Sequence, residues 1–245
     1  MGWSGMGRFN TEWIVGLHGP LDRLDTGLFT VPGEIVMPLG RFPRRMTVAA
    51  LSGGRVAIWS AIPLREPEML QIDAMGEVAV LIVPGPGHRL DIAPWKARYP
   101  SARVVCPPGA QRAVEEVVPV EATGDVLNDS EVRLETVAGV GELEGALLVR
   151  REGRLTLVVN DILANVRHPH GIGANIMARL LGFGVRRPRM PRIGKRMFVK
   201  DIDALAGEFR RWAADPGLAR IVVSHGDVID ENPRAVLERV ASDLA

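Results

Sequence analysis

The amino-acid sequence predicts an α/β protein in which two mixed β-sheets pack face to face and helices cover their outer sides. Three observations predict this fold class. Short apolar runs punctuated by glycine and proline indicate a meander of strands over residues 27–60. Residues 63–106 alternate helix-like and strand-like patterns, and further strand patterns follow over residues 131–160. This mixture excludes a simple all-parallel nucleotide-binding sheet and favours two packed layers of strands.

The first half of the chain contains a hairpin followed by β-α-β order. The phrases RMTVAAL and RVAIWS flank Gly53-Gly54, and two glycines supply the positive φ values that a tight turn needs. The expected elements that follow are a helix at 65–75, a strand at 78–83, a helix at 91–99, a strand at 102–106 and a short helix at 108–117.

The second half returns to strands before it ends in helices. A second hairpin is expected across Glu152-Gly153. The apolar residues of the last helix share one face at helical spacing, which is typical of a helix packed on a core. The expected elements are strands at 131–137, 145–151 and 154–160, helices at 171–181 and 201–213, a strand at 219–223 and a helix at 233–244.

The composition fits one domain and excludes several classes of partner. The 245 residues are 47% hydrophobic, enough to fill a large core. We expect a single domain over residues 1–245, with a basic cap or insertion at about 165–200. Thirty basic and 29 acidic residues give a net charge of +1. Because this charge attracts neither nucleic acid nor an anionic membrane, we expect a small-molecule substrate instead.

Targeting signals are absent from the sequence pattern. The first ten residues, MGWSGMGRFN, lack the basic start and apolar stretch of a secretory signal. The apolar runs are far shorter than the roughly 20 residues of a membrane-spanning helix. Cys106 is the single cysteine and lies in an apolar run, so we expect a small buried hydrophobic side chain. These features predict a soluble cytoplasmic protein.

Three potential metal ligands each follow an apolar run: His88, Asp161 and His225. Loops beyond the ends of several strands can converge on one point, and three such loops make a pocket. Two imidazoles and a carboxylate, completed by water, form the ligand set of an activating zinc site. The alternative is that each residue caps a helix or forms a turn.

A family resemblance extends over residues 29–226. It rests on the ordered phrases RMTVAAL, WSAIPL, GHRLDIAPWKARYPSARVVCPPG, TLVVNDIL and SHG. In this order they resemble the metallo-β-lactamase superfamily, and more closely a branch known only as a domain of unknown function. The resemblance implies a four-layer αββα sandwich of two mixed sheets, with a metal-binding cleft along one edge of the sheets.

The resemblance also implies a reduced metal site. Hydrolases of the superfamily usually carry a His-x-His-x-Asp-His run, and in the matching window 83–88 only His88 remains. The next histidine of the family would fall near Val140, where no imidazole is present. The bridging aspartate matches Asp161 and the final histidine matches His225. We therefore expect at most one divalent metal, with zinc as the first candidate, and a fully metal-free site remains the alternative.

Two functional hypotheses follow. The first is a single-metal hydrolase that acts through metal-activated water on a small ester-like or phosphoryl substrate. The second is a catalytically silent relative that keeps the sandwich as a binding or regulatory module without metal. No matching motif places a general acid or a general base.

Four other side chains are candidates for a role near the site, and a fifth, Asp91, is left out of it. His168 or His170 could lend a ligand or a proton-transferring group. Asp91 is expected to be the N-cap of the helix at its position. Glu142 and Glu144 flank the place of the missing histidine, and either could supply a carboxylate.

A basic segment extends from Arg186 to Lys200, and no acidic residue lies between Gly184 and Lys200. We expect a loop or cap here that is either a solvated insertion or a site for phosphate, RNA or an anionic surface. The glycine-rich phrase at 139–145 is followed by strands instead of a helix, and the phrase at 83–87 has proline where amide donors are needed, so nucleotide binding is rejected at both.

Overall fold

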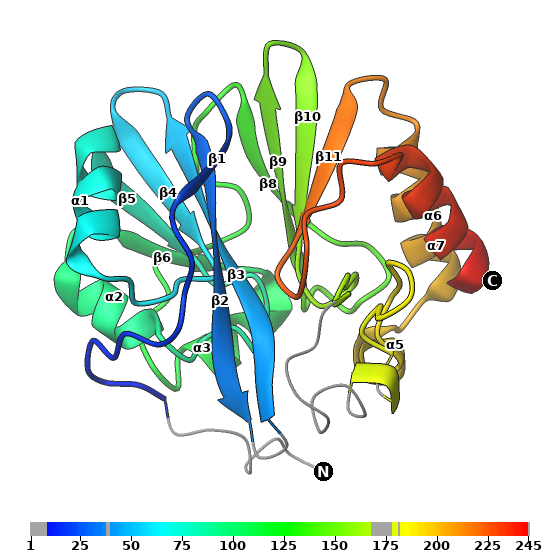
Figure 1. Ribbon diagram of the computed structural model, residues 1–245, viewed down its shortest axis with the longest axis horizontal. Helices are drawn as coiled ribbons and strands as arrows, with labels where there is room; N and C mark the ends of the chain where they lie inside the picture. The colour runs from blue at the N-terminus through cyan, green and yellow to red at the C-terminus, as the bar shows by residue number, and fades with distance from the viewer. Residues whose placement is uncertain (1–8, 38–39, 168–177, 181, 245) are drawn as a thin grey trace.

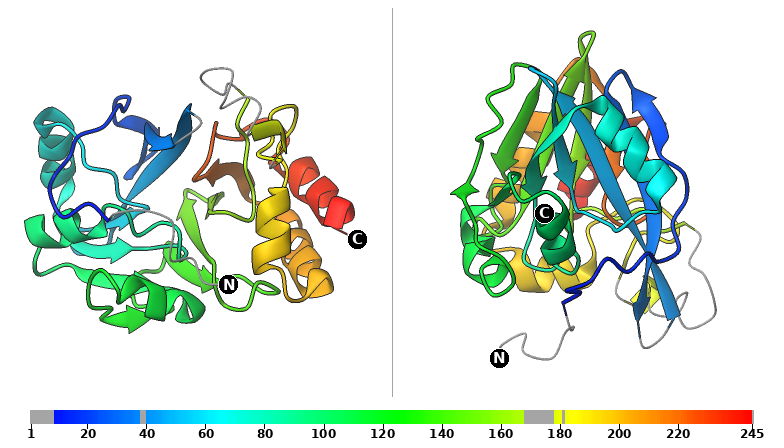
Figure 2. Two further views of the ribbon diagram at one scale, coloured as in Figure 1. Left: turned by 90° about the horizontal axis from the view of Figure 1, so that it is seen from below. Right: turned by 90° about the vertical axis from the view of Figure 1, so that its left-hand side faces the viewer.

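The computed structural model describes residues 9–37, 40–167, 178–180 and 182–244. Two β-sheets pack against each other in the centre, and helices cover the outer face of each sheet (Figure 1). The view from below shows the same order of layers (Figure 2, left). The expected four-layer αββα sandwich is confirmed.

The first sheet contains seven strands that follow one another in chain order. Pairing is antiparallel from β1 to β4 and parallel from β4 to β7. The expected hairpin at Gly53-Gly54 joins β3 and β4, and both glycines have positive φ. The strands are β1 (Asp22–Asp25), β2 (Leu28–Met37), β3 (Gly40–Leu51), β4 (Arg55–Trp59), β5 (Glu77–Ile82), β6 (Arg103–Cys106) and β7 (Ala122–Thr123).

Three helices accompany the first sheet: α1 (Glu66–Met75), α2 (Ile92–Arg98) and α3 (Gln111–Val114). A 3₁₀ turn, η1 (Pro108–Ala110), leads into α3. The helix expected at 108–117 is therefore shorter than its sequence pattern indicates. The helix ends at Val114 and the chain turns. Val118, which follows this turn, is 7% exposed and packs in the core, and this burial favours the turn over a longer helix.

The second sheet has the strand order β11-β10-β9-β8. Its strands are β8 (Val132–Thr136), β9 (Gly145–Arg151), β10 (Arg154–Val159) and β11 (Leu218–Val223). The hairpin expected at Glu152-Gly153 joins β9 and β10, whereas β11 is parallel to β10. The outer helices are α5 (Arg192–Phe198), α6 (Ile202–Ala213) and α7 (Pro233–Leu244).

Both sheets are buried on both faces, which explains why their strands are continuous apolar runs. In β5, Val80 and Ile82 belong to the core between the sheets, while Leu81 packs in the core beneath the first set of helices. In β10, Val158 faces the other sheet and Leu157 belongs to the core that α6 and α7 cover. Side chains that alternate between two cores hold the four layers together.

Two expectations for residues 165–200 have different outcomes. His168, His170 and most of the helix expected at 171–181 lie outside the described residues. The expectation of a loop or cap from Arg186 to Lys200 is wrong in part, because α5 is a helix. This helix forms because it can bury Gly194 and Phe198 while its basic side chains point elsewhere.

Two further properties bear on the expectations from composition. Cys106 is 0% exposed, as expected, and burial raises the pKa of its thiol to about 12. Among the described residues, no helix combines the length and the apolar character needed to cross a lipid bilayer.

We predict that Gly76→Ala destabilises the protein far more than Gly53→Ala. Both glycines have positive φ, but a β-carbon at Gly76 would overlap the carbonyl oxygen of Gly54, whereas nothing lies within 4 Å at Gly53. We expect Gly76→Ala to lower the free energy of unfolding by about 3 kcal/mol and Gly53→Ala by about 1 kcal/mol. Urea unfolding measures both, and equal losses would contradict the close approach.

Candidate metal centre

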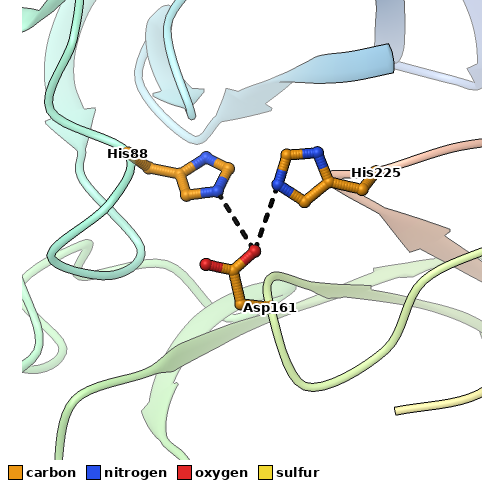
Figure 3. Close-up of side chains that lie close together, drawn as sticks. All are labelled: His88, Asp161 and His225. Atoms are coloured by element: carbon orange, nitrogen blue, oxygen red, sulfur yellow. Dashed lines mark ion pairs between the residues drawn. The ribbon is translucent and has the colours of Figure 1, made fainter. Parts of the chain in front are cut away.

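The three ligands expected from the sequence lie together at one end of the sandwich (Figure 3). His88 follows β5 of the first sheet, and Asp161 and His225 follow β10 and β11 of the second. Because β10 and β11 are parallel neighbours, their last residues leave the sheet at the same edge. One ligand atom from each residue lies within 4.8 Å of the others. The cluster therefore joins loops from both sheets.

Both imidazoles direct Nε2 at the same carboxylate oxygen. Asp161 Oδ1 lies 3.5 Å from His88 Nε2 and 3.1 Å from His225 Nε2, and the two ring centroids are 5.1 Å apart. The side chains are 9%, 14% and 20% exposed for His88, His225 and Asp161, so a solvent path to the cluster remains. Two imidazoles and one carboxylate agree in type and number with the protein ligands of catalytic zinc.

Outer hydrogen bonds fix the orientation of both rings. His225 Nδ1 donates to the carbonyl oxygen of Pro43 at 2.8 Å, and His88 Nδ1 lies 2.8 Å from Ser60 Oγ. Since a carbonyl oxygen only accepts, the neutral ring of His225 carries its proton on Nδ1 and keeps a lone pair on Nε2. Such outer partners typically orient metal-binding histidines.

The pKa values of the two histidines are shifted in opposite directions. Burial disfavours a charge on His225, but the hydrogen bond and charge of Asp161 outweigh it and raise the pKa of this ring. Burial prevails at His88 and lowers its pKa. Burial also opposes the charge of Asp161, yet both imidazoles together hold the pKa of the carboxyl well below its usual range. Without metal, Asp161 is thus a carboxylate, and its Oδ1 lies nearer to His225 Nε2 than to His88 Nε2.

The loop that carries His225 depends on a glycine. Gly226 has a φ of 112°, and a β-carbon there would overlap the carbonyl oxygen of Asn165. The amide of Asn165 donates to the carbonyl oxygen of His225 at 3.0 Å, and Arg45 Nε donates to that of Gly226 at 3.0 Å. These contacts hold the imidazole of His225 over the end of β10.

Asp91 does not act as the N-cap that its position predicts. It precedes α2, but its carboxylate accepts no hydrogen bond from the helix. Instead it accepts one from Asn10 Nδ2 at 2.6 Å and forms an ion pair with Arg44. The side chain of Asp91 is 0% exposed, and a buried carboxylate gains more from a guanidinium than from a capping amide.

Glu144 occupies the space beside the turn at residues 83–87. It is 0% exposed, and its Oε2 accepts hydrogen bonds from Asn160 Nδ2 at 2.9 Å and from the amide of Asp161 at 3.2 Å. A side chain at Gly85 would overlap Glu144 Oε1. Burial, and then the charge of Asp161, raise the pKa of Glu144 well above its usual value. Glu142, the other glutamate considered, is exposed.

The cluster opens into a cavity of about 310 Å³ with mostly apolar walls. α5 contributes part of the wall through its apolar side chains, and no basic side chain of the segment from Arg186 to Lys200 lines the described cavity. An apolar wall excludes water and strengthens the electrostatic interactions inside. The large apolar side chains are Ile35, Phe42, Leu90, Phe183, Ile193, Met197 and Phe198.

No protein-family model matches the chain, and no curated protein matches it significantly. Among solved structures, TMB-1 has a TM-score of 0.61 at 15% identity, covering 94% of this chain and 99% of that one. The DIM-1 metallo-β-lactamase exposed to ceftazidime has a TM-score of 0.61 at 12% identity, covering 92% and 97%. The chain has the metallo-β-lactamase fold.

A third structure with this fold has a defined metal content. The FIM-1 metallo-β-lactamase of Pseudomonas aeruginosa, in its mono-zinc form, has a TM-score of 0.58 at 10% identity and covers 94% of this chain and 98% of that one. In the described part of the present metallo-β-lactamase fold, His88, Asp161 and His225 form the one group of His, Cys, Asp or Glu donors close enough to hold a cation.

We predict that Asp161→Asn lowers the pKa of His225 in metal-free protein, because burial then acts without the opposing carboxylate. A raised folded-state pKa stabilises the protein below the unfolded value of about 6.5, and this stabilisation is lost as pH rises through the raised pKa. The wild type should therefore exceed Asp161→Asn in unfolding free energy by more at about pH 5.5 than at about pH 9. NMR titration of the imidazole and urea unfolding test this, and a pH-independent difference would contradict it.

Proposed function

We propose that this protein is a hydrolase that uses one divalent metal, with zinc as the first candidate, and acts on a small ester-like substrate. His88, Asp161 and His225 are the proposed ligands. The convergence of their three donor atoms within 4.8 Å carries the proposal. A divalent cation bound there supplies Lewis-acid activation of water or of a substrate oxygen.

The remaining residues of the site prepare it for this chemistry. Pro43 keeps the proton of His225 on Nδ1, and Ser60 orients the ring of His88, so both Nε2 atoms are directed inward. Asp161 supplies the negative charge that a cation requires. The apolar walls hold the rest of the substrate and limit the access of bulk water.

The cavity favours an ester-like substrate over a phosphoryl substrate. In its described lining, Arg44 is the only residue with a guanidinium or ammonium group, and this charge is paired with Asp91. A phosphate dianion would have to lose its hydration shell beside the carboxylate of Asp161, with the proposed metal as its one unpaired cationic partner in the described lining. A neutral ester with an apolar group would instead bury that group against the walls.

A catalytically silent relative is the second candidate. It is favoured by the 83–87 turn, whose residues offer no side-chain ligand, and by Glu144, which fills the adjacent space. The two candidates differ in whether the His88, Asp161 and His225 cluster binds a metal at all.

We predict that protein purified without chelator contains one equivalent of divalent metal, and that His88→Ala and His225→Ala each abolish it. His18→Ala is the matched control, because His18 Nε2 accepts a hydrogen bond from the amide of Arg65 and lies outside the cluster. Zinc at about 100 times its dissociation constant should stabilise the wild type and the control by about 2.7 kcal/mol. Elemental analysis and thermal unfolding measure this.

The opposite result distinguishes the silent relative. Protein without metal, with a melting temperature that neither zinc nor manganese changes, would contradict the hydrolase proposal.

We predict that Ile193→Asp lowers kcat/KM for a neutral ester with an apolar acyl chain by about tenfold, because it removes apolar contact from the cavity wall. Ile193 is 40% exposed, so the variant should fold. Metal content and the rate with an acetyl ester serve as controls and should change little. Faster hydrolysis of a phosphate monoester than of any carboxylic ester would contradict this substrate class.

A further inference from the structure

A second cavity, of about 410 Å³, lies next to the metal centre. β3 separates the two cavities, because successive side chains of a strand point to opposite faces. Phe42 lines the cavity of the metal centre, whereas Arg41, Pro43 and Arg45 line the second one. His88, Asp161 and His225 do not line the second cavity. It is therefore a separate binding space and does not depend on metal.

Basic side chains outnumber acidic ones in the lining of this second cavity. Glu34 and Asp227 are its acidic residues, and Glu34 lies 3.6 Å from Arg41. Arg44, which reaches both cavities, is paired with Asp91. The described lining therefore keeps an excess of positive charge. Its arginines are Arg41, Arg44, Arg45 and Arg167.

Arg45 is the innermost of these cations. The residue is 8% exposed, its Nε donates to the carbonyl oxygen of Gly226 at 3.0 Å, and its Nη1 donates to Thr30 Oγ1 at 3.3 Å. Among the described residues, Nη2 has no hydrogen-bond partner. Burial lowers the pKa of Arg45, although Asp227 and Asp22 favour its charged form. Nη2 is not among the fully buried side-chain atoms that lack a partner, so solvent or a ligand in the cavity can reach this donor.

The chemistry of the cavity indicates its ligand. Guanidinium groups bind carboxylate and phosphate oxygens through charge-assisted, often bidentate hydrogen bonds. Arg45 offers a donor inside the cavity, while Arg41 and Arg167 are exposed and can approach a ligand from solvent. We propose that this cavity binds a small molecule through a carboxylate or phosphate group, with Arg45 as the inner contact and Arg41 and Arg167 at the rim.

Calorimetric titration of the metal-free protein with inorganic phosphate at low ionic strength tests the proposal. We expect one saturable site per chain, with an affinity that falls as sodium chloride is added. Arg45→Gln should weaken binding by about tenfold or more, because a charged hydrogen bond is lost. Arg112→Gln is the matched control, since Arg112 is exposed on α3 and does not line the cavity.

Two further variants keep the test decisive if Arg45→Gln fails to fold. Arg167→Gln changes an exposed rim residue and should also weaken phosphate binding relative to Arg112→Gln. His88→Ala alters the metal centre alone and should bind phosphate as the wild type does. Equal affinity in Arg167→Gln and Arg112→Gln, or loss of binding in His88→Ala, would overturn the proposal.

A parallel titration with succinate distinguishes the two sources of an anionic group. Tighter binding of phosphate identifies a phosphorylated ligand, and tighter binding of succinate identifies a carboxylate ligand. Either result supports the site, whereas no saturable heat with both anions would refute it.

Discussion

The carboxylate of Asp161 is the constraint on which the candidate metal centre depends. This carboxylate contacts one imidazole from beside each sheet. His88 follows β5 of the first sheet, and His225 follows β11 of the second. In a cavity with apolar walls, a lone carboxylate or a lone imidazolium would carry a large desolvation cost. The three side chains offset this desolvation cost for one another. Their contacts thereby hold the ends of the two sheets together.

Much of this arrangement can be predicted from the sequence, and the reason is physical. Strands buried on both faces leave uninterrupted apolar runs, and the polar residue that ends such a run lies at the sheet edge. His88, Asp161 and His225 are found in this way. Pro43 and Ser60 are not, because a carbonyl oxygen has no side-chain signature and a serine at a strand end is common in turns.

The expectations that proved wrong concern places where long-range contacts outweigh local rules. Asp91 has the position and chemistry of an N-cap. Its carboxylate nevertheless forms an ion pair with Arg44, which is distant in the sequence. The segment around α5 is rich in arginine, proline and glycine, so its local pattern indicates a loop. Its few apolar residues, Ile193, Met197 and Phe198, nevertheless all lie in the wall of one cavity. Tertiary packing at this wall stabilises the helix.

The contact between Gly85 and Glu144 restricts how this scaffold could be redesigned. A histidine introduced at position 85 would overlap Glu144 Oε1, so the buried side chain of Glu144 would have to shift to make room for it. Removing Glu144 first would leave Asn160 Nδ2 and the amide of Asp161 without their acceptor. A route from this chain to a second cation site at position 85 therefore has to keep an acceptor for these two donors, either by a shift of Glu144 or by a new side chain.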